Sequence, residues 1–252
     1  MAETLTSNVL RGWREEEYGR SRGGLPLRVQ LPAAEAPVAG LLVATQHGEE
    51  AETGLLARRL LERIPGDETA WAVIQVANPD GLMNGTRQNS AGVDLNRNFP
   101  GSSWRPDPSF TFPPGVDPEL RKLPNRTSRS SPGPEPASEP ETRALMALVE
   151  ELQPRLVLDL HAPIELILVR AGVPPEPVEL LATASGLRVV SELEVDSPGA
   201  FDEWLLEQGI PAIVYEVEHA GLPQLCLRHL PGLEALLRGD ALSGTATPAQ
   251  SG

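Results

Sequence analysis

The chain has 252 residues, 40% of them hydrophobic, with a formal net charge of −14 and a single cysteine, Cys226. The acidic balance argues against nucleic acid or an anionic membrane surface as a partner, because both require clustered Lys and Arg. The lone cysteine excludes an internal disulfide and a thiolate zinc cluster, so any metal must be held by His and carboxylate side chains.

The first twenty residues are polar and contain no apolar signal core. No apolar run in the chain approaches the roughly 18 to 20 residues that a membrane span needs. We therefore expect a cytoplasmic protein with no membrane partner.

Short apolar runs bounded by turn residues alternate with helical patterns along the chain, which predicts a largely parallel sheet with helices on both faces. We expect buried strands within 38–45, 70–78, 154–161, 165–170 and 211–217, and helices within 51–64, 138–153, 175–186 and 201–209. Ser138 and Glu141 have the spacing of a capping box at the start of one helix. The chain is thus expected to form a single α/β domain over residues 1–240, with an irregular loop at 101–137 and a disordered tail at 241–252.

Three candidate metal ligands are placed at the ends of buried strands. His47 follows the first strand, Glu50 falls in the first turn of the next helix, and His161 ends the run "RLVLDLH". Ligands bind at this edge of open α/β sheets. Two histidines and one carboxylate with a vacant fourth position are the ligand set of a catalytic zinc ion.

A candidate base and candidate substrate-binding residues accompany these ligands. Glu216, at the end of the strand "IVYEV", could hold the proton of an attacking water, and Glu218 is the rival because it is expected on the same strand face. The stretch 78–100 supplies Arg87, Asn96 and Arg97, donors suited to a carboxylate and an oxyanion. The alternative is an Asn- and Gly-rich loop with solvated arginines.

The motifs "HGEE", "NPDG", "GVDLNRNFP", "SEPET", "LDLHAP", "SPGAFDEW" and "IPAIVYE" occur in the order typical of the zinc carboxypeptidase superfamily. Over residues 38–220 the chain resembles this superfamily, and within it the bacterial murein peptide amidases. "GVDLNRNFP" with "SEPET" is highly specific, whereas "HGEE" alone is weak. The resemblance implies a zinc-carboxypeptidase-like fold that binds one zinc ion.

The resemblance also implies a role for each matching residue. His47, Glu50 and His161 are the implied zinc ligands, and Glu216 is the implied general base and acid. Arg87 corresponds to the arginine that stabilises the oxyanion, and Asn96 and Arg97 to the pair that binds the terminal carboxylate of the substrate. Asp94 corresponds to the aspartate that orients the first zinc histidine. Asp159 shares a strand face with His161, and the sequence leaves open whether it orients that histidine.

Two departures from the superfamily concern the substrate. Val195 stands where the superfamily usually has a tyrosine that closes over substrate, nine residues before Trp204. Asp202 and Glu203 stand where the murein amidases tend to have small residues. Asp202 is therefore a candidate for binding an amine on the leaving group, and the alternative is a solvated acid in the first turn of a helix.

The resemblance thus implies a zinc-dependent amidase for the γ-D-glutamyl-meso-diaminopimelate bond of murein peptides. Three alternatives stay open: a carboxypeptidase acting on ordinary α-peptides, an acylamino-acid hydrolase of the aspartoacylase type, and a non-catalytic muropeptide binder. His219 and His229 have no carboxylate at ligand spacing, so we expect surface or packing histidines there.

Overall fold

The computed structural model describes residues 10–33, 37–106, 131–192 and 197–239. Its strands form one eight-stranded mixed sheet in the order β1-β2-β4-β3-β5-β8-β6-β7. The strands are β1 (Trp13–Arg20), β2 (Pro26–Pro32), β3 (Gly40–Val43), β4 (Trp71–Ile74), β5 (Leu156–His161), β6 (Leu166–Val169), β7 (Arg188–Val190) and β8 (Ala212–Glu216). The helices are α1 (Ala51–Arg63), α2 (Pro79–Asn84), α3 (Pro140–Leu152), α4 (Pro175–Ser185), α5 (Phe201–Glu207) and α6 (Leu222–Leu237), with 3-10 turns η1 (Gly66–Glu68) and η2 (Leu95–Arg97).

The centre of the sheet is parallel, as the sequence predicts. Strands β4, β3, β5 and β8 run parallel, whereas β6 runs antiparallel to β8. Every residue of β3, β4, β5 and β8 is buried, which explains why their sequences are apolar except at Asp159, His161 and Glu216. Their carboxyl ends therefore meet at one edge, where the candidate ligands lie.

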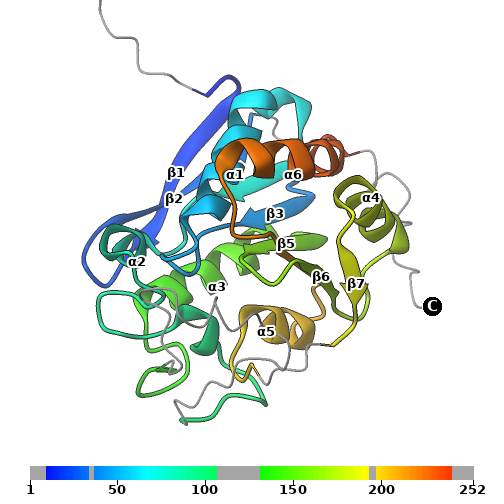
Figure 1. Ribbon diagram of the computed structural model, residues 1–252. Helices are drawn as coiled ribbons and strands as arrows, with labels where there is room; N and C mark the ends of the chain where they lie inside the picture. The colour runs from blue at the N-terminus through cyan, green and yellow to red at the C-terminus, as the bar shows by residue number, and fades with distance from the viewer. Residues whose placement is uncertain (1–9, 34–36, 107–130, 193–196, 240–252) are drawn as a thin grey trace, which may run out of the picture.

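Helices cover both faces of the sheet. One face packs a large apolar cluster against α1, α4 and α6, and the other packs a second cluster against α3 and α5. Figure 1 shows α1 and α6 above the sheet and α3 and α5 below it. None of the helices in the described ranges is long and apolar enough to cross a membrane.

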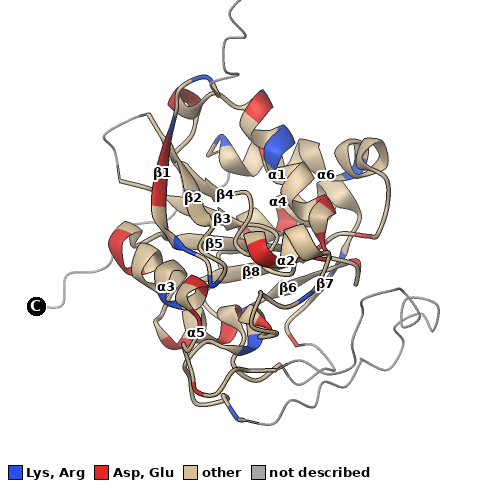
Figure 2. Ribbon diagram, turned by 90° about the vertical axis from the view of Figure 1, so that its left-hand side faces the viewer, with Lys and Arg blue, Asp and Glu red and all other residues tan. Residues whose placement is uncertain are grey.

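Two strands at the edge of the sheet, β1 and β2, were not predicted from the sequence. β1 and β2 form an antiparallel hairpin that joins the sheet through β4. β1 has four consecutive exposed residues, 14–17, so it shows no apolar alternation that would reveal a strand. The acidic residues of β1 colour this edge strand red in Figure 2. Charge on an edge strand disfavours pairing with another chain.

Three further elements were also missed, each for a local reason. α2 has six residues and contains Pro, Gly and Asn, which are typical of turns. α6 contains Pro231 in its interior, where proline removes a backbone hydrogen bond and usually ends a helix. β7 has only three residues, two of them exposed.

Two of the sequence motifs are helix starts. In "NPDG", the Asn78 side chain accepts a hydrogen bond from Gly81 N, and Pro79 occupies the first turn of α2. In "GVDLNR", the Asp94 side chain accepts from Asn96 N at the start of η2.

The capping box predicted at residues 138–141 is wrong. The N-cap of α3 is Glu139, and no side chain caps this helix. Ser138 Oγ instead donates to the Glu139 carboxylate at 2.9 Å. Glu141 instead accepts from Arg22 N at 2.8 Å. A tertiary contact has thus taken the carboxylate that local spacing assigned to the cap.

Of the irregular loop predicted at 101–137, the structure describes residues 101–106 and 131–137. Residues 101–106 and 131–137 contain no helix, and Ser131 makes only an isolated bridge to Val93. Residues 107–130 and the predicted disordered tail at 241–252 lie outside the described residues.

Gly48 of "HGEE" is required by a close backbone approach. A Cβ atom at this position would lie 1.9 Å from the carbonyl carbon of Gly81 in α2. Only glycine lets these two backbones meet, so the loop carrying His47 packs directly on the "NPDG" helix.

Candidate metal centre

Three buried side chains converge at the carboxyl edge of the sheet, as predicted. His47 lies in the loop between β3 and α1, four residues beyond the strand end at which it was expected. Glu50 is the N-cap residue of α1, but its carboxylate does not cap the helix. His161 is the last residue of β5. Each of the three is 2% exposed.

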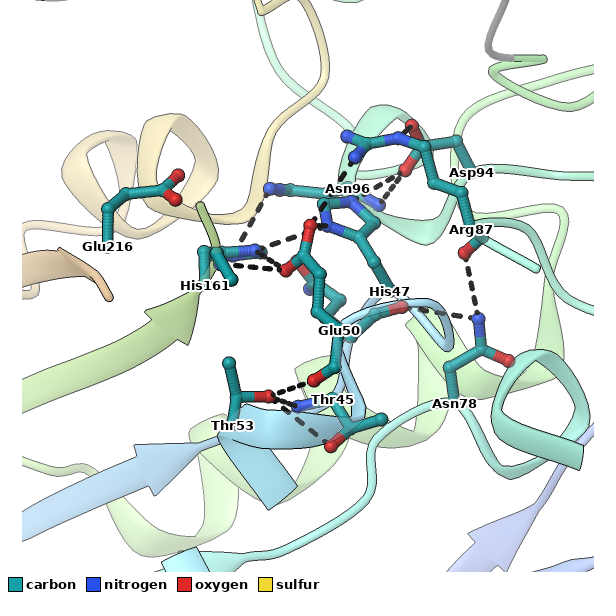
Figure 3. Close-up of polar contacts among 12 residues, drawn as sticks. Thr45, His47, Glu50, Thr53, Asn78, Arg87, Asp94, Asn96, His161 and Glu216 are labelled. Carbon is teal, nitrogen blue, oxygen red and sulfur yellow. Dashed lines mark hydrogen bonds and ion pairs between the residues drawn. The ribbon is translucent and has the colours of Figure 1, made fainter. Parts of the chain in front are cut away.

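The facing atoms of these residues form a compact donor set (Figure 3). Nδ1 of His47 lies 2.9 Å from Oε1 of Glu50 and 3.2 Å from Nδ1 of His161, and Nδ1 of His161 lies 3.1 Å from Oε2 of Glu50. One ligand atom from each residue lies within 4.8 Å of the others, so the group can hold a metal ion. Nitrogen and carboxylate oxygen are donors that suit zinc.

Each histidine binds a second carboxylate through its other ring nitrogen. Nε2 of His47 lies 3.1 Å from Oδ1 of Asp94, and Nε2 of His161 lies 2.9 Å from Oδ2 of Asp159. This arrangement leaves both Nδ1 atoms facing Glu50, and it is the usual way of orienting a metal-bound imidazole. The question that the sequence left open for Asp159 is therefore answered: it contacts His161.

Backbone and hydroxyl contacts fix the position of Glu50. Ala162 N donates to Oε2 of Glu50 at 3.2 Å, and Thr53 Oγ1 donates to the Glu50 carbonyl at 2.8 Å. Burial raises the pKa of Glu50, but His47 and His161 outweigh burial and hold the pKa well below its ordinary value. This carboxylate is thus kept ionised, as a metal ligand must be.

Arg87 lies next to the donor set and contacts Asp94, the partner of His47. Its Nε donates to Oδ2 of Asp94 at 2.7 Å, and its Nη1 lies 3.6 Å from Oε1 of Glu50. Burial raises the pKa of Asp94, but Arg87 and His47 outweigh burial and hold the pKa well below its ordinary value. Asp94 therefore ties the arginine to the first histidine.

Asn96 and Arg97 lie in η2, between the donor set and α5. Asn96 Nδ2 is 3.5 Å from Nε2 of His161, and Asn96 Oδ1 accepts from Phe201 N at 2.8 Å. Nη2 of Arg97 donates to Ser197 Oγ at 3.3 Å. These two residues therefore connect the candidate metal centre to the start of α5.

Glu216 differs from the other carboxylates of the site because no cation pairs with it within the described residues. It ends β8 directly beside His161 in the sheet register and is 7% exposed. In the part of the chain that the structure describes, its carboxylate accepts one hydrogen bond, from Ile164 N at 3.4 Å. Burial, opposed by His161, raises the pKa of Glu216 to about 7. Such a group can exchange a proton near neutral pH.

Glu218 does not compete with Glu216 for the site. β8 ends at Glu216, so the expectation that Glu218 shares its strand face is wrong. Oε2 of Glu218 lies 2.7 Å from Nε2 of His229 and 3.1 Å from Nη1 of Arg228, both on α6. The Glu218 carboxylate therefore contacts α6, in the helix layer on the sheet face opposite α5.

Both histidines that were assigned to the surface or to packing have carboxylate partners. His219 is exposed and its Nδ1 lies 2.7 Å from Oε1 of Glu52. His229 is fully buried between Glu218 and the Tyr215 hydroxyl, which lies 2.8 Å from its Nδ1. Their predicted locations are confirmed, and the partners come from residues distant in sequence.

Asp202 is buried, so the alternative of a solvated helix acid is wrong. Its Oδ2 accepts from Arg170 Nε at 2.6 Å. Arg170 was not predicted as a site residue, because its only sequence clue is that it is a cation at the end of the apolar run "ELILVR". Val195 lies outside the described residues.

The mixed α/β sheet thus places a His-Glu-His donor set at its carboxyl edge, an arrangement that suits a metal-dependent hydrolase. The family model of the zinc carboxypeptidases matches residues 34–205, and the chain belongs to this family.

Two relatives match nearly the whole chain. Murein peptide amidase A of Escherichia coli strain K12 is 32% identical over 224 residues, which cover 88% of this chain and 89% of the relative. Murein peptide amidase A of Vibrio campbellii is 30% identical, with coverage of 88% and 87%.

Solved structures agree with these relatives. The murein-tripeptide amidase of Escherichia coli O157 superposes with a TM-score of 0.80 at 29% identity and covers 94% of this chain and 96% of that chain. Thrombin-activatable fibrinolysis inhibitor shares the fold, with a TM-score of 0.72 at 17% identity over 92% of this chain and 70% of that chain.

Proposed function

We propose that this chain is a zinc-dependent amidase that hydrolyses the γ-D-glutamyl-meso-diaminopimelate bond of murein peptides. The observation that carries the proposal is that a complete His-Glu-His donor set lies beside Glu216, a buried carboxylate that pairs with no cation among the described residues. The nearly full-length similarity to murein peptide amidases supports the substrate class.

We assign one zinc ion to His47, Glu50 and His161. When bound, zinc polarises the scissile carbonyl and lowers the pKa of a water molecule. Asp94 and Asp159 hold the two imidazoles in the orientation that ligation needs.

Glu216 takes the proton of the attacking water and returns it to the leaving amine. A pKa of about 7 suits both steps, because the same group must accept a proton and then release it. This exchange is typically worth about 10²- to 10⁴-fold in rate.

Arg87, Asn96 and Arg97 position the substrate. Arg87 borders Glu50 and donates to the oxyanion that forms on the carbonyl. Asn96 and Arg97 bind the terminal carboxylate of the substrate, next to the start of α5. Asp202 belongs to the leaving-group side of the site.

The alternatives differ from this proposal in substrate or in chemistry. A carboxypeptidase for ordinary α-peptides would use the same residues. The aspartoacylase type lacks "NPDG" and "SEPET", which in this chain begin α2 and α3. A non-catalytic binder would be free to lose Glu216, and the chain keeps it together with all three ligands. A cytoplasmic location and a role in recycling wall peptides stay predictions from the sequence.

The test is to incubate the zinc-loaded protein with L-Ala-γ-D-Glu-meso-diaminopimelate and follow free diaminopimelate by mass spectrometry. The same peptide joined through the α-carboxyl of glutamate is the matched substrate, and chelator-treated protein is the control. We expect metal-dependent release from the γ-linked peptide only. Release from the α-linked peptide alone would identify an ordinary carboxypeptidase, and no release from either would reject the amidase.

A further inference from the structure

On the sheet face that α5 covers, the side chains of β5, β8 and β6 form three rows across the strands, at increasing distance from the candidate metal centre. Side chains two residues apart on a strand point to the same face, about 7 Å apart along it. The strand pairing and the hydrogen bond from Arg170 N to the Ala212 carbonyl define the rows as His161, Glu216 and Leu166; then Asp159, Val214 and Leu168; then Val157, Ala212 and Arg170.

The last row carries a partly buried ion pair. Arg170 donates through Nε to Oδ2 of Asp202, the second residue of α5, and their side chains are 18% and 6% exposed. Within the described residues, the Nη atoms of Arg170 and Oδ1 of Asp202 make no hydrogen bond, and the nearest further charge is Glu203 at 3.9 Å from Nη2. The pair thus uses one donor of a five-donor guanidinium and one oxygen of a carboxylate.

A second carboxylate oxygen on this face lacks a partner. Oδ1 of Asp159, in the middle row, is buried and has no hydrogen bond within the described chain, whereas Oδ2 contacts His161. A buried polar atom without a partner is costly, and a bound ligand group can satisfy it. The face therefore offers unused acceptors as well as unused donors.

The ion pair is joined to the residues assigned to the substrate carboxylate. Phe201 N, one residue before Asp202, donates to Oδ1 of Asn96. Asp202 also acts electrostatically on Arg97: burial lowers the pKa of Arg97, and the negative charge of Asp202 raises it. The subsite proposed below requires that a substrate held by Asn96 and Arg97 direct the side chain of its last residue along the rows toward the ion pair.

The pairing changes what Asp202 can recognise. An isolated buried aspartate favours any cation, but an aspartate neutralised by arginine no longer does. A carboxylate beside a guanidinium is instead complementary to a group that carries an ammonium and a carboxylate on one carbon. The guanidinium donors bind the ligand carboxylate, and the free aspartate oxygen accepts from the ligand ammonium.

Building on the proposed function, we propose that Arg170 and Asp202 select a leaving amino acid whose side chain ends in both an ammonium and a carboxylate. meso-Diaminopimelate has this ending, separated by three methylene groups from the α-carbon. L-Lysine lacks the distal carboxylate, and L-2-aminopimelate lacks the distal ammonium. The three compounds therefore separate the role of Arg170 from the role of Asp202.

Calorimetric binding of the three free amino acids to the zinc-loaded protein tests the proposal. We expect meso-diaminopimelate to bind roughly 10- to 100-fold more tightly than either analogue, because each analogue leaves one buried charge without its ligand partner. Equal affinities, or tighter binding of L-lysine, would overturn the proposal.

Single variants assign the two charges. Arg170→Met should remove the preference for meso-diaminopimelate over L-lysine, and Asp202→Asn should remove the preference over L-2-aminopimelate. Arg58→Met is the matched control, because Arg58 also donates through Nε to a carboxylate, Glu62, but on the outer surface of α1. It should keep the wild-type order of affinities. Unchanged selectivity in both single variants would contradict the assignment.

A double variant keeps the test valid if a single variant fails to fold. Replacing both members of a buried ion pair with apolar residues is often neutral for stability. Arg170→Met with Asp202→Leu should bind L-norleucine more tightly than meso-diaminopimelate, reversing the wild-type order. Retention of the wild-type order would reject the subsite.

The binding assay separates failure of this inference from failure of the proposed function. If meso-diaminopimelate binds selectively but the γ-linked peptide is not cleaved, the subsite stands and the amidase proposal falls. If the peptide is cleaved but all three amino acids bind equally, the amidase stands and the subsite falls.

Discussion

The two sides of the site treat their carboxylates in opposite ways. On the ligand side, Glu50 and Asp94 each contact more than one nitrogen of His47, His161 or Arg87. On the leaving-group side, the Glu216 carboxylate accepts one long hydrogen bond from a backbone nitrogen, Ile164 N, among the described residues. The pKa is held well below its ordinary value for Glu50, although burial opposes this, and burial raises it to about 7 for Glu216.

This contrast shows how one buried edge can supply both a permanent charge and a titrating group. Burial alone raises the pKa of a carboxyl group, and nearby cations or donors reverse the shift. The metal-ligand side needs carboxylates of fixed charge and fixed geometry, and the contacts with His47, His161 and Arg87 supply both. The proton-transfer side needs a group that changes its charge during turnover, and among the described residues no cation pairs with Glu216.

The largest expected effect comes from Glu216→Gln. It should lower kcat by about 10²- to 10⁴-fold, because an amide cannot accept the proton of the attacking water. Zinc content, measured by atomic emission, should stay at the wild-type level because Glu216 is not an assigned ligand. Glu218→Gln is the matched control and should retain activity, since Glu218 contacts α6. Equal loss in both variants would erase the contrast between these two carboxylates.

The next largest effect is on zinc affinity and tests the carboxylates that contact the two histidines. Asp94→Asn should weaken zinc binding roughly 10- to 100-fold, because Asp94 contacts both His47 and Arg87. Asp159→Asn should weaken it less, because an asparagine oxygen can still accept from His161 Nε2. Competition with a fluorescent zinc chelator measures both. A larger loss of zinc affinity in Asp159→Asn than in Asp94→Asn would contradict this prediction.

A smaller effect should appear in the pH dependence of wild-type activity. The base form of Glu216 is deprotonated, and its pKa is raised to about 7, so kcat/KM should increase with pH through that value and level off above it. Well below pH 7 the expected slope is about tenfold per pH unit. Initial rates between pH 5.5 and 8.5 measure it. A flat profile would assign proton transfer to a group with a lower pKa.

The smallest effect measures how much an exposed ion pair outside the site contributes to the stability of the fold. Arg58→Ala breaks the exposed pair with Glu62 on α1, where the two side chains are 33% and 29% exposed. It should lower the free energy of unfolding by only about 0.3 to 0.5 kcal/mol, measured by urea denaturation. A loss above 2 kcal/mol would show that exposed pairs contribute as much as the buried contacts of the site.

The central elements were predictable because burial imposes apolar runs. β3, β4, β5, β6 and β8 and helices α1, α3, α4 and α5 each fall within a range expected from the sequence. The hairpin of β1 and β2 was not, because an edge strand with an exposed face carries no such run. α6 was missed because Pro231 normally ends a helix, whereas packing against α1 and α4 keeps this helix continuous.

The residue types of the candidate site were also readable from the chain. His161 and Glu216 end strands, whereas His47 and Glu50 lie between a strand and the following helix. Such positions meet at one edge of a parallel sheet. The motifs around them are local, because a turn or a helix start depends on a few adjacent residues. Order, residue type and approximate position are therefore properties that the sequence by itself determined.

Only the tertiary structure decided how these side chains pair. The ring nitrogen that each histidine presents depends on Asp94 and Asp159, and the partner of Asp202 is Arg170, 32 residues away in the chain. Glu218 was a plausible base by sequence spacing until α6 was seen to bind it. The physical reason is that hydrogen bonds and ion pairs act over a few ångströms in space, and sequence distance does not determine which groups come that close.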